Sequence, residues 1–456
     1  MSAHRYRIYD PLTDAHIPLN HEQQVTSYWR AHPTQPEAPV TDNCNVLPAQ
    51  CETLIIGAGY TGLNAALTLA EHGHNVVVID AGAIAAGCSS RNAGFVLPAS
   101  GRLSIQNYSD TFGADVAAGV LNEFNAGVRH VEHLAARMHT EHGVDCQYAA
   151  SRYLRIAHNS GQVAPLQQLA DNHAPWPRQF LTAADLQHQL PGVRHAHGAL
   201  EQTPAGRVHP LALAQGYAQL ARAAGARIVT QCAALNITEL PSGCDVATSQ
   251  GHIRAEHVML CSNGYANRQL FSQVTTRQLP ALSSIGVTQP LSRWQVEQLG
   301  LTPNDLVMDT RRLKYYYRLL PDQRLLFGGR GAISGKDAQH PKYQAQLHQA
   351  MLATLPVLRG VGFKYAWSGW VSVTLDSYPR SYQHSQHISA ALGYCGAGIS
   401  FASLAGKRLA QRRLGHTLPP LPFYQRAPLQ FSLPGLRRTG QRLYYQYARL
   451  RDNLNW

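Results

Sequence analysis

The stretch TLIIGAGYTG at residues 53–62 has the pattern of a strand, a glycine-rich turn and the start of a helix. Its first four residues are apolar or β-branched, as in a buried parallel strand, and a helix is predicted over 61–73. A second strand, 76–80, ends in Asp80, eighteen residues after Gly62. In this context the GxGxxG motif predicts a dinucleotide-binding unit of the Rossmann type.

The glycines of this motif have separate tasks. Gly57 permits the sharp turn, Gly59 lets the backbone approach a pyrophosphate, and Gly62 allows the helix to pack closely on the strand. The phosphates would then lie at the helix N-terminus, where unpaired N–H groups stabilise anionic oxygens. Asp80 would accept hydrogen bonds from a ribose and would repel a 2′-phosphate, which favours FAD or NAD over NADP. The alternative is a glycine turn that binds nothing. The predicted contacts of this half of the cofactor are Gly57, Gly59, Tyr60, Thr61, Gly62 and Asp80.

Length and composition are those of a globular protein of two or three domains, at 456 residues and 45% hydrophobic. No stretch approaches the roughly twenty apolar residues of a membrane span, and the N-terminus lacks the apolar core of a signal peptide. We therefore expect a cytoplasmic protein. The eight cysteines are scattered without the spacing of a zinc site, so we expect no metal.

The net charge of +12 is concentrated at the C-terminus, because residues 407–456 hold ten Lys or Arg side chains against Asp452 alone. Near the end, four apolar residues recur at helical spacing with three arginines beside them, which predicts a basic amphipathic helix. These residues are Leu443, Tyr447, Leu450 and Leu454, with Arg438, Arg442 and Arg449. Such a helix could contact an anionic membrane surface; the alternatives are packing against the protein and an oligomer contact. Although the tail is basic, it lacks a recognised RNA-binding motif, so we expect no nucleic acid partner.

The order of patterns along the chain predicts an α/β plus α+β protein with two domains. A second strand, glycine cluster and helix lie at 387–392, 393–398 and 399–414, which suggests another ligand-facing turn. The predicted division is an N-terminal arm (1–50), a nucleotide domain (51–150, 200–275 and 380–415), an antiparallel-sheet substrate domain (151–199 and 276–379) and the basic tail (416–456).

Six motifs together resemble the FAD-dependent oxidoreductases of the D-amino-acid oxidase and glycine oxidase superfamily, over about residues 51–415. They are GCSSRNAGF (87–95), GRVHPLALAQGYAQLARAAGARIV (206–229), CSNGYANRQL (261–270), YYYRLLPDQRLLFGGR (315–330), WSGWVSVTLDSYP (367–379) and GYCGAGISFASLAGKRLA (393–410). The arm, the SRNAG loop and the YYRL…RLLFGG run look most like bacterial gamma-glutamylputrescine oxidoreductases and related amine oxidoreductases.

The resemblance implies a Rossmann-like FAD-binding domain and an antiparallel-sheet substrate domain, with the flavin between them. It also implies further cofactor contacts. Those along the pyrophosphate and flavin are Ser90, Arg91, Asn92 and Gly94, and the contact at the adenine is Ala234. Gly264 lies in the turn that approaches the cofactor, and the contacts at the flavin end are Gly396, Ala397, Gly398 and Ile399. Sarcosine-oxidase-like members attach FAD through a cysteine near 367–376, where this chain has none, so we expect non-covalent FAD.

The same resemblance places Tyr316 opposite the substrate, with Trp370 and Val371 lining the flavin side of the pocket. In glycine-oxidase-like sequences an arginine at the position of Val371 clamps the substrate carboxylate, and valine cannot form that pair. We therefore expect an amine without an adjacent carboxylate, of the gamma-glutamylputrescine or polyamine type. It would be oxidised by hydride transfer to FAD, and the imine would hydrolyse to an aldehyde.

Two alternatives remain open from the sequence. A D-amino-acid or N-methylamino-acid (glycine, sarcosine) oxidase or dehydrogenase is possible if Arg318 contacts the carboxylate. A nucleic-acid-associated flavoprotein is supported only by the basic tail. The sequence leaves oxygen and a quinone equally open as the electron acceptor.

Overall fold

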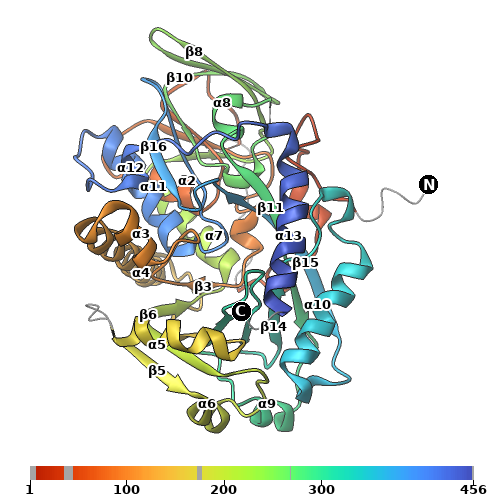
Figure 1. Ribbon diagram of the computed structural model, residues 1–456. Helices are drawn as coiled ribbons and strands as arrows, with labels where there is room; N and C mark the ends of the chain where they lie inside the picture. Colours follow the sequence, from red (N-terminus) through yellow and green to blue (C-terminus); the bar gives the residue numbers. More distant parts are fainter. Residues whose placement is uncertain (1–6, 35–44, 172–176, 268, 454–456) are drawn as a thin grey trace.

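A computed structural model describes residues 7–34, 45–171, 177–267 and 269–453 of the chain. Within them the chain forms two sheets, A and B, which lie at opposite ends of the molecule in Figure 1. Helices pack on sheet A, and the C-terminal helix runs beside β11 and β15. The predicted combination of a Rossmann-like domain and an antiparallel-sheet domain is confirmed.

Sheet A contains the nucleotide-binding unit. Its path is β16-β17-β10-β1-β2-β7, with the β8–β9 hairpin attached to β10. Strand β1 runs parallel to both β2 and β10 and is buried on both sides, which explains its continuous apolar run. The strands are β1 (Gln50–Ile56), β2 (Val76–Ile79), β7 (Arg227–Val229), β8 (Ala234–Leu240), β9 (Gly243–Thr248), β10 (Gly251–Leu260), β16 (Arg380–Gln383) and β17 (Ile388–Leu392).

Three of the helices that contact this sheet are α2 (Tyr60–Ala70), α7 (Pro210–Ala223) and α11 (Ile399–Arg413). Helix α4 (Ala114–His142) packs on α7 and α11. The crossing of α2 and α11 is made backbone to backbone. A Cβ atom on Gly406 would lie 2.0 Å from the Thr61 carbonyl oxygen, and one on Gly62 would lie 2.0 Å from that of Gly57. The two glycine-rich turns that precede these helices are thereby held together, although they are far apart in sequence.

Sheet B follows the path β15-β11-β14-β13-β12-β4-β6-β3, with β5 paired to β6. All its pairs are antiparallel except β4 with β12. The strands are β3 (Phe95–Val96), β4 (Ala149–Ile156), β5 (Arg178–Thr182), β6 (Gly198–Arg207), β11 (Leu279–Thr288), β12 (Asp305–Asp309), β13 (Tyr316–Leu319), β14 (Leu325–Gly329) and β15 (Phe363–Val373). Strands β3 and β6 extend sheet B into segments that the sequence assigned to the nucleotide domain, at 51–150 and from 200 onward.

The remaining helices are short, apart from α10 and α13. They are α1 (Tyr28–Ala31), α3 (Ile105–Phe112), α5 (Val163–Asp171), α6 (Ala183–Gln189), α8 (Ser272–Thr275), α9 (Arg293–Leu299), α10 (Pro341–Thr354), α12 (Pro422–Gln425) and α13 (Arg437–Asn453). Single 3-10 turns lie at His21–Gln24, Cys88–Ser90, Ser160–Gln162, Asn263–Tyr265, Gly335–Asp337, Pro356–Leu358 and Pro434–Leu436.

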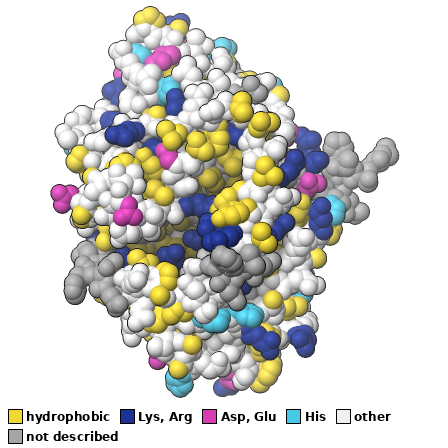
Figure 2. All heavy atoms as spheres, in the orientation of Figure 1, with side chains coloured by type: hydrophobic (Ala, Val, Ile, Leu, Met, Phe, Trp, Pro, Cys, Tyr) yellow, Lys and Arg dark blue, Asp and Glu magenta, His cyan; other side chains and the backbone are white. Residues whose placement is uncertain are grey.

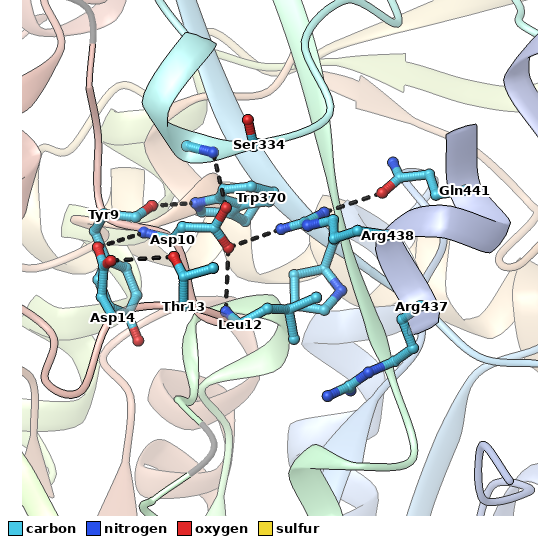
Figure 3. A network of polar contacts seen from close by, with 12 residues as sticks. Tyr9, Asp10, Leu12, Thr13, Asp14, Ser334, Trp370, Arg437, Arg438 and Gln441 are labelled. Atoms are coloured by element: carbon cyan, nitrogen blue, oxygen red, sulfur yellow. Dashed lines mark hydrogen bonds and ion pairs between the residues drawn. The ribbon is translucent and has the colours of Figure 1, made fainter. Parts of the chain in front are cut away.

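The arm and the tail meet on the body of the protein (Figure 3). The Asp10 carboxylate pairs with Arg438 at 2.8 Å and accepts a hydrogen bond from the Gly335 N–H at 2.8 Å. The Arg438 guanidinium lies 4.7 Å from the ring centroid of Trp370, whose indole N–H donates to the Tyr9 carbonyl at 2.7 Å. Trp29 of the arm is buried and donates to the Asn92 carbonyl at 2.8 Å.

The tail helix is amphipathic, but its buried side is partly polar. Arg437 and Arg438 turn inward, and Arg438 donates to the Pro280 carbonyl at 2.6 Å. Arg438, predicted to lie beside the apolar face of this helix, uses its charge to dock the helix onto Asp10 and Pro280, so at this residue the alternative of packing against the protein holds. Leu443, Tyr447 and Leu450 are exposed at 62%, 48% and 59%, while Leu454 lies outside the described residues. No helix in the described ranges has the length and apolar character needed to cross a membrane.

Candidate FAD and substrate site

The β1–α2 turn forms one end of the site. Gly57 has a φ of +114°, and a Cβ atom there would lie 2.8 Å from the Cys261 carbonyl oxygen at the end of β10. Gly57, Gly59, Asp80 and Ala234 line one small cavity at this edge of sheet A. Several contacts predicted for the ADP half of the cofactor are thus brought together at the carboxyl ends of parallel strands, where this fold class binds nucleotides.

Asp80 is held in place at the end of β2. Its carboxylate accepts hydrogen bonds from the Ala58 N–H at 2.8 Å and the Gly82 N–H at 2.9 Å. Burial raises its pKa to about 6, against the two backbone hydrogen bonds that lower it. Additional hydroxyl donors, as on a ribose, would stabilise the ionised carboxylate.

Several buried polar atoms around this cavity lack a hydrogen-bond partner among the described residues. They are both ring nitrogens of His21, the Ser90 hydroxyl and the Asn263 side-chain oxygen. Burial, with Arg91 and Arg30 adding to it, lowers the pKa of His21 to about 3, so the ring is neutral and can donate one hydrogen bond. Because buried polar atoms are nearly always paired, this set fits a polar ligand such as a dinucleotide. His21 and Asn263 line the cavity and were missed by the sequence analysis.

The loop at 87–95 is shaped by Asn92. Its amide donates to the Tyr60 hydroxyl at 3.2 Å and to the carbonyls of Cys88 and Ser89 at 3.1 Å, and its oxygen accepts from the Gly94 N–H at 2.8 Å. This loop is thereby fixed to the first turn of α2. The Arg91 guanidinium is buried and donates to the His21 carbonyl at 3.1 Å.

A second, larger cavity of about 700 Å³ adjoins the first. Both cavities are lined by Gly59, Cys88, Ser89, Cys261 and Asn263, so one extended ligand could occupy them in sequence. The larger one lies between the turn at 396–399 and strands of sheet B. It is lined by the predicted contacts Gly59, Tyr60, Thr61, Arg91, Asn92, Gly396, Ala397, Gly398 and Ile399.

Four predicted contacts do not line either cavity: Gly62, Ser90, Gly94 and Gly264. Three of them are glycines at close approaches of the chain. A Cβ atom on Gly94 would lie 2.3 Å from the Val208 carbonyl oxygen, and one on Gly264 would lie 3.1 Å from the Val371 carbonyl carbon. These glycines therefore support the walls of the site.

Strand β15 presents alternate residues to the large cavity. Gly369, Val371 and Val373 line it, whereas Trp370 is completely buried on the other face of the strand, against Tyr9 and Arg438. The prediction that Trp370 and Val371 line the pocket together is wrong for Trp370. Since successive side chains of a strand point to opposite faces, only one of two neighbours can face the site.

Tyr316 begins β13 and lines the large cavity. Its hydroxyl is 2.9 Å from the Ser283 hydroxyl, and its ring lies against the backbone of Gly328, where any Cβ atom would clash. Burial raises the pKa of Tyr316, so the phenol stays protonated and serves as a neutral hydrogen-bonding group.

The large cavity is strongly cationic. Arg102, Arg312, Lys314 and Arg330 line it together with the buried Arg91 and Arg437, and no Asp or Glu within the described residues does. Burial lowers the pKa of Lys314 to about 8; Arg155, Arg102 and Arg330 lower it further and Asp309 raises it. Lys314, Arg102, Arg312 and Arg330 were not predicted to line the site. Lys314 lies two residues before Tyr316, a spacing that places both side chains on one side of an extended segment, so this spacing was an available signal.

Arg318, the expected alternative contact for a carboxylate, does not line the cavity. It is 2% exposed, donates to the Val208 carbonyl at 3.0 Å and lies 5.4 Å from the Trp29 ring centroid. The backbone at Gly94 covers its guanidinium. This position follows from tertiary packing and has no local sequence signal.

A family model described as FAD dependent oxidoreductase (DAO) matches residues 52–412. The chain belongs to this family. Its similarity to gamma-glutamylputrescine oxidoreductase of Escherichia coli (strain K12) is 31% identity over 368 residues, which covers 79% of this chain and 83% of the relative. The family is one of FAD-dependent oxidoreductases, and this chain acts on CH–NH donors.

Solved structures show the same fold. Glycine oxidase from Geobacillus kaustophilus superposes with a TM-score of 0.70 at 20% identity, covering 81% of this chain and 96% of that one. L-proline dehydrogenase from P. horikoshii gives 0.67 at 20% identity, with 86% and 99% covered. The match of the family model ends at 412, so the tail that carries α13 lies beyond it.

Proposed function

We propose that this protein oxidises the C–N bond of an amine that has no carboxylate on the reacting carbon, with gamma-glutamylputrescine or a polyamine-type amine as substrate. The observation that carries this proposal is that Val371, an aliphatic side chain, lies on the cavity wall. Amino-acid-oxidising members of the family that this chain resembles have an arginine at the same position. A carboxylate placed against Val371 would lose its water without gaining a charged partner.

When bound, FAD supplies the acceptor for the hydride that leaves the substrate. The residues that would hold it are Gly57, Gly59 and Asp80 for the ADP half and the turn at 396–399 for the flavin. The neutral polar and aliphatic groups of Tyr316 and Val371 would orient the substrate carbon.

The cationic lining supports the chemistry of an amine donor. Only a neutral amine has the lone pair that assists hydride loss, whereas a free alkylamine has a pKa near 10.4 and is protonated at neutral pH. Lys314 and Arg330 line the same cavity, and like charges disfavour the ammonium form. The released proton passes to water, so the reaction needs no side-chain base.

We propose that the FAD is not covalently bound. Three cysteines line the large cavity: Cys88, Cys261 and Cys395. They are poor nucleophiles because burial raises the pKa of all three thiols, to about 11 for Cys395 and about 12 for Cys261. Acid precipitation should leave a colourless pellet and a yellow supernatant. Yellow colour on the pellet would contradict this proposal.

Anaerobic addition of candidate amines to the purified yellow protein tests the function. Bleaching of the flavin absorbance by gamma-glutamylputrescine, putrescine or spermidine, with none by glycine, sarcosine or D-alanine, would support it. Bleaching by the amino acids alone would identify the competing amino-acid oxidase, for which Lys314 and Arg330 are cations on the wall of the same cavity as Tyr316. Reoxidation by air or by a soluble quinone then identifies the acceptor.

We further propose that the enzyme is cytoplasmic and that its tail contacts an anionic membrane surface, which would bring the reduced flavin to quinones. Leu443, Tyr447 and Leu450 form an exposed apolar stripe, and Arg442 and Arg449 beside it are exposed. Cosedimentation with vesicles containing phosphatidylglycerol should fall when Leu443 and Leu450 are both replaced by Ser. Equal recovery with neutral vesicles, or none with either, would end this proposal.

A further inference from the structure

Four of the six cations that line the large cavity, which we call the cationic collar, come from three separate segments. The other two, Arg91 and Arg437, are buried and donate to backbone carbonyls. Arg102 lies before α3, Arg312 and Lys314 lie in the β12–β13 loop, and Arg330 follows β14. Arg102 and Arg312 are exposed, whereas Lys314 and Arg330 are half-buried. The collar therefore reaches from the solvent into the cavity that Tyr316 and Val371 also line. Figure 2 shows dark-blue side chains gathered beside a hollow in the middle of this face.

The hydrogen bonds that the collar side chains donate go to neutral acceptors. Arg102 donates to the Arg312 carbonyl at 3.1 Å and to the Tyr444 hydroxyl at 2.8 Å. Arg330 donates to the Leu282 carbonyl at 3.2 Å. Within the described residues no collar side chain forms an ion pair. A charged donor in a half-buried position that meets only neutral acceptors keeps much of its capacity to bind an anion.

The nearest carboxylates are already engaged elsewhere. Asp309 pairs with Arg311 and accepts from the N–H of Tyr315 at 3.1 Å. Asp452 accepts from the N–H groups of Arg312 and Leu313, at 2.7 and 3.0 Å. Neither aspartate lines the cavity, so the collar keeps its positive charge.

The tail helix holds two collar arginines in place. The Arg102 guanidinium lies 5.4 Å from the Tyr444 ring centroid, and that of Arg312 lies 5.5 Å from the Tyr447 ring centroid. Both tyrosines belong to α13, and Tyr444 itself lines the cavity. The part of the chain outside the family match thus shapes the entrance of the site.

The collar is not required for the cofactor phosphates. The turn at Gly57 and Gly59 offers backbone N–H groups at the start of α2, and these glycines line the smaller cavity, which no collar residue does. The anion that the collar attracts is therefore a separate part of the bound ligands.

We propose that the cationic collar binds a carboxylate at the end of the substrate remote from the oxidised C–N bond, and that it discriminates against free polyamines. This inference rests on the proposed amine oxidation and narrows its substrate class to N-acylated amines that carry a distal carboxylate. A polyamine would bring a second ammonium group into a cavity whose charged side chains, among the described residues, are all cations, and like charges repel. Val371 still excludes a carboxylate at the reacting carbon.

The test compares two substrates that share one reacting amine. N-glutarylputrescine carries a distal carboxylate, and N-acetylputrescine has a neutral end. The rate constant for flavin reduction divided by the dissociation constant is measured for each by anaerobic stopped flow on the holoenzyme. We expect the carboxylate substrate to be favoured at least tenfold, and putrescine to be the poorest of the three. An equal or greater value for N-acetylputrescine would overturn the collar proposal, while the bleaching itself would uphold amine oxidation.

Variants locate the preference in the collar. Lys314→Gln should reduce the preference for N-glutarylputrescine over N-acetylputrescine by about tenfold, the usual effect of losing one charge-assisted contact. The readout is the ratio of the two substrates, in which any effect of Lys314 on the shared reacting amine cancels. Lys364→Gln removes the same charge from an exposed position on β15 outside the cavity and should leave the preference unchanged. FAD content and the flavin spectrum monitor folding in both. If Lys314→Gln and Arg102→Gln, each with full FAD content, keep the preference of the parent protein, the collar is not the binding site. If no amine bleaches the flavin, both proposals fail.

Discussion

Replacing Gly57 by alanine tests the cofactor site through a change of one methyl group. Gly57 has a φ of +114°, which costs an alanine about 1–3 kcal/mol in backbone strain. Its Cβ would also lie 2.8 Å from the Cys261 carbonyl oxygen and 3.1 Å from the Ser262 nitrogen. Both obstacles are backbone atoms at the end of β10, so the turn must move, and Gly59 and the start of α2 would move with it.

The expected result is a loss of FAD affinity of about 10- to 100-fold, which corresponds to about 1.4–2.8 kcal/mol. The measurement is the dissociation constant of FAD, from fluorescence during dialysis of the holoenzyme. The chain provides a matched control in Gly225, whose φ of +107° is nearly the same but whose Cβ would have nothing within 4 Å. Gly225→Ala should carry the strain alone and lower the melting temperature without changing the affinity for FAD.

Two outcomes would refute the reasoning. Unchanged FAD affinity in Gly57→Ala would mean that the turn does not hold the cofactor. An equal loss in Gly225→Ala would mean that backbone strain, and not the approach to Cys261, governs the effect.

Three further predictions concern the substrate wall, the tail and pH. Tyr316→Phe removes the hydroxyl bonded to Ser283 and should lower turnover several-fold with full FAD content; unchanged kinetics would dispose of its role. Arg438→Gln leaves Asp10 as a buried carboxylate without its cation, at a cost of about 3–5 kcal/mol, and should lower the melting temperature by several degrees, whereas exposed Arg442→Gln in the same helix should not. The pKa of Lys314 is lowered to about 8 by burial and by the surrounding arginines, so this side chain is charged below that pH and neutral above it. The preference for N-glutarylputrescine over N-acetylputrescine should therefore decline as the pH rises through 8; because the reacting amine is the same, its own titration cancels in the ratio, and a flat ratio from pH 7 to 9.5 would contradict the assignment.

Local sequence was sufficient to predict the secondary structure of the nucleotide-binding half of the site. The strand, turn and helix at 50–70 have an apolar run, a glycine with positive φ and a helix start, each of which follows from neighbouring residues. The same holds for β17 and α11 around the second glycine cluster. The resemblance to a family then supplied the pairing of these distant segments, and the packing of α2 against α11 confirmed it.

Which residues line the substrate cavity depends on the alternation of side chains along the strands and on which segments cover those strands. Trp370 and Val371 are adjacent in sequence, yet they face opposite sides of β15. Tyr316 and Arg318 lie on the same side of β13, but the backbone at Gly94 covers Arg318 and leaves Tyr316 at the cavity. The alternation of side chains along a strand could have corrected the prediction for Trp370. The prediction that Arg318 contacts a carboxylate could be corrected only by a contact between residues far apart in the chain.

By itself, the sequence determined the dinucleotide unit, the two-domain class and the basic, amphipathic character of the tail, because these follow from short-range periodicity and composition. Only the tertiary structure decided what the charges do. Arg438 is used in docking α13 onto Asp10, while Arg102 and Arg312 are held at the cavity mouth by tyrosines of that same helix. The physical reason is that the effect of a charge depends on its burial and its partners, and both are set by segments that meet only when the chain folds.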